Sequence, residues 1–262
     1  MTDGSMREAG WVWEGQGLDP GVHPSIFGAG EGAAYFGLSR AHHMFHPNDD
    51  LAMTKLSGLD EVVCDISKWR FKDTEGGGSA CYGDAAYQTV RAEAANVSRL
   101  SLGYPNITGA IHDDMKGLVE REGITPDRYA DIHAALKRDN PELKLWSVVY
   151  THELDPAVWA DFLPFIDVVN LWVWNAKDLH KLDDDLERCR EIFAPRPIVI
   201  GCYIRDYPSQ AAVPMDRLQY QWERVAAHLT DGKIAGYAIL GSVLIDVHQE
   251  HARWMRDFIA SH

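Results

Sequence analysis

Four carboxylic acids stand directly after apolar segments of the chain. Asp113 and Asp114 are adjacent, and Glu153 and Asp206 follow two later segments. Carboxylates that lie close together raise the pKa of one member, so one serves as an acid and the other as a base. Adjacent strand residues point to opposite faces, so we expect one aspartate in a site and the other outside it. The pattern predicts catalysis by Asp113 or Asp114, with Glu153 or Asp206 as the partner.

Aromatic and hydrogen-bonding side chains also stand at or near the ends of apolar segments. Flat rings stack on the C–H face of a pyranose, while carboxylates, amides and charged groups bind its hydroxyls. These residues predict contacts with a carbohydrate substrate. The expected substrate-binding residues are Trp13, Glu14, His46, Asp65, Tyr150, Trp174, Asn175, Tyr203 and Arg205, with the ring of Tyr207 near them.

Histidines at similar positions allow a second chemistry. Imidazoles and carboxylates from several segment ends could together bind a divalent metal ion. The chain has HHxxH where one metal-dependent superfamily has HxH, and it contains no HExxH. We therefore expect no metal and no other cofactor, and we retain a metal-dependent sugar isomerase, epimerase or hydrolase as the alternative. The ligands in that case would come from His42, His43, His46, Asp65, His112, His152 and Glu153.

Eight apolar segments alternate with amphipathic stretches, and several are continuous apolar runs typical of parallel strands covered on both faces. Eight such units in 262 residues, without an interior linker, predict an α/β fold: one (β/α)8 TIM-barrel domain over residues 1–262, irregular at about 15–37. The competing open sheet lacks a GxGxxG motif after its first strand. The expected strands are 10–14, 39–45, 61–67, 107–113, 143–151, 166–174, 197–204 and 235–240.

Helix signals fall between these segments. Thr125 precedes Pro126 as an N-cap, and Asn140-Pro141 ends the helix that follows. In a (β/α)8 barrel the catalytic groups lie at the carboxyl ends of the strands, where the acids and aromatic residues are expected here. The expected helices are 31–37, 51–56, 125–139, 155–164, 177–193, 215–229 and 247–259.

Composition excludes several classes of partner. The 25 basic and 39 acidic residues give a net charge of −14, which repels nucleic acid and anionic membranes. No apolar run is long enough to span a membrane, and the first ten residues do not resemble a signal peptide. The chain as written is expected in the cytoplasm, although removal of a signal peptide is compatible with it. A homo-oligomer is compatible with the sequence too.

Three segments carry a resemblance to (β/α)8-barrel glycoside hydrolases: Ala110–Asp114, Leu171–Asn175 and Gly201–Tyr207. In the large clan of retaining barrel enzymes the acid/base follows strand four and the nucleophile follows strand seven. The resemblance places Asp114 or Asp113 at the first position and Asp206 at the second. The chain departs from the clan, which usually carries Asn-Glu after strand four and a glutamate after strand seven. It also lacks the DxxDxDxE strand of chitinase-like barrels.

Together these features predict a glycosidase, a hydrolase of carbohydrate metabolism that cleaves a glycosidic bond with paired carboxylates. Asp114 would protonate the leaving oxygen, and Glu153 or Asp206 would act as base or nucleophile. Whether the reaction retains or inverts the anomeric configuration depends on the distance between the two carboxyl groups. A carbohydrate-binding barrel without catalysis is the second alternative.

Overall fold

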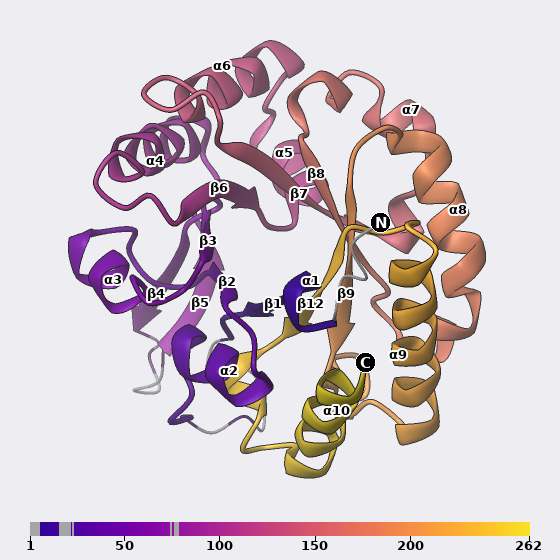
Figure 1. Ribbon diagram of the computed structural model, residues 1–262. Coiled ribbons are helices and arrows are strands. Elements are labelled where there is room, and N and C mark those ends of the chain that lie inside the picture. The colour runs from indigo at the N-terminus through magenta and orange to yellow at the C-terminus, as the bar shows by residue number, and fades with distance from the viewer. Residues whose placement is uncertain (1–5, 16–21, 23, 74, 76–78) are drawn as a thin grey trace.

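The structure is a computed structural model that describes residues 6–15, 22, 24–73, 75 and 79–262. Eight parallel strands close into a barrel in the order β1-β12-β9-β8-β7-β6-β3-β2, and Figure 1 shows the helices surrounding them. The barrel strands are β1 (Gly10–Trp13), β2 (Arg40–His43), β3 (Glu61–Asp65), β6 (Ile107–His112), β7 (Lys144–Tyr150), β8 (Val168–Trp172), β9 (Ile198–Tyr203) and β12 (Gly236–Leu240).

Helices connect the barrel strands, and two hairpins extend the connections. The hairpins pair β4 (Trp69–Asp73) with β5 (Ser79–Gly83) and β10 (Arg205–Asp206) with β11 (Ala211–Ala212). The α-helices are α1 (Met6–Ala9), α2 (Ala29–Phe36), α3 (Asp50–Lys55), α4 (Tyr87–Leu100), α5 (Met115–Glu122), α6 (Pro126–Leu136), α7 (Pro156–Trp159), α8 (Leu182–Phe193), α9 (Met215–Thr230) and α10 (Gln249–Ser261). Short 3₁₀ helices are η1 (Thr151–Glu153), η2 (Leu163–Phe165), η3 (Ala176–Lys181) and η4 (Ser242–Leu244).

Aromatic rings pack against one another inside the barrel. The ring of His42 lies 5.1 Å from Trp11, 5.0 Å from Trp13 and 5.2 Å from Trp146, measured between centroids. Glycine makes room for an indole in the same interior, because a Cβ at Gly201 would lie 2.0 Å from the ring of Trp172. The barrel is thus a packed core that opens only at its ends.

The barrel predicted from the apolar segments is confirmed, and each expected strand overlaps one of the eight. The segment expected as one helix over 177–193 is divided into η3 and α8. In the portion expected to be irregular at about 15–37, residues 29–36 form α2, while residues 16–21 and 23 lie outside the described residues. None of the described helices is both long and apolar enough to cross a membrane.

Candidate functional site

The turn after β6 places two acids in one cavity at the carboxyl end of the barrel. Asp114 has the left-handed backbone angles φ 47° and ψ 33°, and its N–H donates to Asp113 Oδ1 at 2.9 Å. Both side chains line a cavity of about 200 Å³. The expectation that the two acids point to opposite faces is therefore wrong, because β6 ends at His112 and strand alternation stops before them.

Tyr150, the last residue of β7, binds Asp114 directly. Its hydroxyl donates to Asp114 Oδ1 at 2.7 Å. Burial raises the pKa of Asp114 above its usual value, and this hydrogen bond opposes the rise without cancelling it. Burial, with Tyr203 and the two aspartates nearby, also raises the pKa of Tyr150 well above its usual value. Tyr150 therefore remains a protonated hydrogen-bond donor at neutral pH.

Glu153 shares a neighbouring cavity of about 420 Å³ with Asp114 and Tyr150. It ends η1, and its Oε2 accepts a hydrogen bond at 3.0 Å from the backbone N–H of Tyr150. Burial raises the pKa of Glu153, and the charge of Asp114 adds to the rise. The structure thus brings Asp113, Asp114 and Glu153 together around Tyr150.

Asp206 occupies a different environment. Its carboxylate accepts hydrogen bonds from the backbone N–H groups of Ala176 at 3.0 Å and Ser209 at 3.2 Å. These contacts fix the loop after β9 to the start of η3. Asp206 is not among the described residues that line the two cavities, whereas Asp114 lines both of them. Its neighbour Arg205 is buried, whereas Asp206 is half-buried.

Aromatic rings form the walls of the smaller cavity. Trp13, Trp174, Tyr150 and Tyr203 line it, as does Tyr207, whose ring stacks on Trp174 at a centroid distance of 5.7 Å. Trp174 is 38% exposed, which leaves one of its surfaces open to a ligand. Stacked aromatic faces beside carboxyl groups are suited to a sugar ring with its alternating C–H and hydroxyl surfaces.

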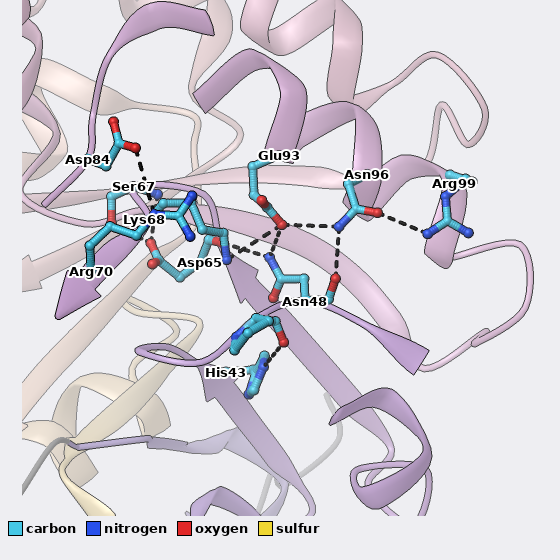
Figure 2. A network of polar contacts seen from close by, with 11 residues as sticks. His43, Asn48, Asp65, Ser67, Lys68, Arg70, Asp84, Glu93, Asn96 and Arg99 are labelled. Carbon is cyan, nitrogen blue, oxygen red and sulfur yellow. Dashed lines mark hydrogen bonds and ion pairs between the residues drawn. The ribbon is translucent and has the colours of Figure 1, made fainter. Parts of the chain in front are cut away.

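The remaining expected substrate contacts lie around this centre. Glu14 and His46 line a third cavity of about 890 Å³, and Asn175 lines a cavity of about 160 Å³ beside Trp174. Asp65 belongs to a separate buried network (Figure 2), in which its Oδ1 accepts a hydrogen bond at 2.8 Å from the N–H of Ser67. The structure therefore does not group Asp65 with Asp114 around the cavities.

The same network contains an ion pair that the sequence did not reveal. Lys68 Nζ lies 3.5 Å from Glu93 Oε1 on α4, and Figure 2 shows both pointing toward Asn48. Asn48 Nδ2 donates to Glu93 Oε1 and to the carbonyl of Asp65, each at 2.9 Å. Burial raises the pKa of Asp65, and the charge of Lys68 opposes that rise. These contacts join the end of β3 to α4.

The histidines of the alternative metal chemistry are dispersed. His42 lies among indoles inside the barrel, while the ring of His112 stacks on Tyr129 of α6 at 5.7 Å. His43 Nδ1 lies 3.1 Å from Glu14 Oε2. Within the described part of the chain, no three His, Cys, Asp or Glu side chains are grouped as metal ligands. The cavities at the ends of β6 and β7 combine carboxyl groups with aromatic walls.

Helix α5 contributes residues that the sequence did not predict, notably Leu118 and Arg121 in the wall of the larger cavity. The available signal was Gly123, which ends α5 with φ 60°. A glycine after a basic last turn is a common end of a helix. Asp114 at the start of α5 is a residue type that often caps helices, but its side chain makes no capping hydrogen bond here.

The chain matches no protein-family model and no curated protein, but it is similar to solved structures. A β-glucuronidase from Bacteroides uniformis is 12% identical with a TM-score of 0.58, over 92% of this chain and 31% of that one. The PgaB (BpsB) glycoside hydrolase domain from Bordetella bronchiseptica is 11% identical with a TM-score of 0.56, over 87% and 91%.

A xylanase-α-amylase inhibitor protein, XAIP-I, solved with trehalose, is 10% identical with a TM-score of 0.57, over 97% and 98% of the two chains. The present chain thus spans under a third of the glucuronidase, but nearly all of the inhibitor protein. Identities of 10–12% show a shared fold. The chain is similar in fold to (β/α)8 barrels that include glycoside hydrolases.

Proposed function

We propose that this protein is a glycosidase that cleaves a glycosidic bond with Asp114 as the general acid. The observation that carries the proposal is the environment of Asp114: a half-buried carboxyl group that lines two adjoining cavities and binds Tyr150. A general acid must hold its proton near the working pH, and burial favours the protonated carboxyl. The aromatic wall supports a carbohydrate as the substrate.

Glu153 is the carboxylate that we assign as base or nucleophile. It lines the cavity of about 420 Å³ together with Asp114, and one of its oxygens accepts a hydrogen bond from the N–H of Tyr150. Both oxygens of Asp206 are engaged by backbone N–H groups, one each, which favours a positioning role for that residue. Asp113 accepts the N–H of Asp114 and orients the proposed acid. The proposed reaction requires no metal and no cofactor.

The test is a set of isosteric variants assayed on a panel of aryl glycosides and oligosaccharides. Asp114→Asn and Glu153→Gln are each expected to lower kcat by at least about a hundredfold, the scale of general acid–base catalysis. Asp206→Asn is expected to lower it less. Asp184→Asn on the exposed face of α8 is the matched control and is expected to keep full activity.

Full activity in Asp114→Asn would contradict the proposal. Binding of sugars by the wild-type protein without turnover of any glycoside would instead indicate a carbohydrate-binding barrel. For an active enzyme, ¹H NMR of the first product anomer shows whether the reaction retains or inverts the anomeric configuration. Retention implies a carboxyl separation of about 5 Å, and inversion one of roughly 6.5–9.5 Å.

A further inference from the structure

A third and larger cavity adjoins the proposed catalytic site. It encloses about 890 Å³ between the ends of β1 and β2, the segment before α2, and α3. We propose that it binds an apolar aglycone, an alkyl or aryl group attached to the sugar that occupies the catalytic cavity. This inference rests on the proposed glycosidase function and specifies the class of substrate.

The two cavities adjoin at Gly15 and Phe45, which line both. Gly15 follows the end of β1 and Phe45 follows the end of β2, so the junction lies at the carboxyl end of the barrel. A group attached to a sugar beside Asp114 can therefore extend past Phe45 into the third cavity. This position suits the leaving part of a glycoside.

The third cavity, of about 890 Å³, is bounded mainly by apolar side chains. Two of them, Ile26 and Leu51, are 84% and 81% exposed, which is unusual for residues of this size. An apolar ligand between them would remove this surface from water. The apolar lining residues are Pro24, Ile26, Phe27, Phe45, Pro47, Leu51, Ala52, Leu56 and Val243.

Several polar groups at its edge already have partners. Glu31 Oε2 accepts the N–H of Gly28 at 3.1 Å and lies 3.5 Å from Lys55 Nζ. Asp49 Oδ1 accepts the N–H of Ala52 at 2.9 Å. A second sugar ring would need partners for several hydroxyls, and these groups are already engaged with each other or with backbone N–H groups. The lining therefore favours an apolar group over another sugar.

One buried acid, Glu14, lines the third cavity and precedes Gly15 in the chain. Glu14 Oε2 lies 3.1 Å from His43 Nδ1 and accepts the N–H of Met44 at 3.2 Å. Burial alone would raise the pKa of Glu14, but His43, His46 and the Met44 N–H together hold it below its usual value. Its Oε1 lies 4.0 Å from His46 Nε2, beyond hydrogen-bond distance. That oxygen can accept a hydroxyl of the sugar next to the aglycone.

The test compares octyl β-D-glucoside, below its micellar concentration, with methyl β-D-glucoside by titration calorimetry on the full chain. We expect the wild-type protein to bind the octyl compound at least about tenfold more tightly. Ile26→Asp and Leu51→Asp are expected to reduce this preference about tenfold, and their exposure leaves the fold intact. Leu102→Asp, at a 68% exposed leucine near the amino end of β6, is the matched control that keeps the preference.

Equal binding of the two glucosides by the wild-type protein overturns the inference, as does an equal loss of preference in Leu102→Asp. A Leu51→Asp variant that changes the oligomeric state by sedimentation, with the octyl preference unchanged, also overturns it and indicates a contact between two copies. Turnover separates the two proposals. Octyl preference without hydrolysis of any glycoside contradicts only the glycosidase, while hydrolysis with equal kcat/KM for octyl and methyl glycosides contradicts only the aglycone cavity.

Discussion

The carboxyl group of Asp114 accepts a hydrogen bond at 2.7 Å from Tyr150. Burial of this carboxyl group raises its pKa, and the hydrogen bond lowers it. A general acid loses activity as the pH rises above its pKa. Because burial dominates and raises that pKa, the alkaline limb of kcat/KM is expected above the usual carboxyl range near pH 4.

Tyr150→Phe tests this balance. The phenol favours the ionised carboxylate, so its removal raises the pKa of Asp114 further and moves the alkaline limb to higher pH. The measurement is the pH profile of kcat/KM for wild type and variant. Tyr104→Phe, which removes an exposed hydroxyl that binds Asp50, is the control and is expected to keep the wild-type profile. A limb that moves to lower pH in Tyr150→Phe would show that another group sets it.

Part of the site was predictable from single residues. The sequence expected Asp114, Tyr150, Glu153 and Trp174 at strand ends, and they line the two adjoining cavities because parallel barrel strands deliver their last residues to one face. The convergence of Asp113 and Asp114 was not predictable, since it depends on a left-handed turn that aspartate adopts only in certain contexts.

At the scale of elements, continuous apolar runs revealed the barrel strands, whereas three α-helices, α1, α4 and α5, escaped prediction. Neither α4 nor α5 begins with a side-chain cap, since Ala86 precedes the first and Asp114, in a left-handed conformation, precedes the second. The contact between α4 and the end of β3 was also hidden. It pairs Lys68 with Glu93, two residues 25 positions apart in sequence that the packing of α4 beside the end of β3 brings together.

Removal of Lys68 is expected to destabilise the junction between β3 and α4. Lys68→Met leaves the charges of Glu93 and Asp65 in a poorly solvated site, and the expected loss is about 3 kcal/mol of unfolding free energy. Urea unfolding measures it. The double variant Lys68→Met with Glu93→Leu is expected to recover part of the lost stability, because it also removes the Glu93 charge that Lys68→Met alone leaves unpaired.

The control for this pair lies on the surface. Lys181 and Asp178 are 2.9 Å apart, but their side chains are 54% and 30% exposed. Solvent screens such a pair, so Lys181→Met is expected to cost less than about 1 kcal/mol. Similar losses in Lys68→Met and Lys181→Met would contradict a special role for the buried network.

At the scale of the whole molecule, closure of the barrel encloses a titratable ring, because His42 of β2 packs against Trp146 of β7. His42 is fully buried among three indoles, and both of its ring nitrogens lack a hydrogen-bond partner within the described residues. Burial lowers the pKa of His42 to about 3, against an ordinary value of 6.5. Between these two pH values the unfolded chain binds a proton at this residue that the folded barrel does not.

The free energy of unfolding is therefore expected to fall as the pH decreases below 6.5, and His42→Leu should remove one part of that fall. Between pH 7.5 and 5.5, wild type is expected to lose about 1 kcal/mol more than the variant, measured by urea unfolding at each pH. His180→Leu is the control, because His180 is an exposed residue of η3 and its imidazole stays hydrated in both states. Parallel pH dependences for wild type and His42→Leu would mean that the folded barrel admits the proton, contrary to the dry environment that three indoles impose.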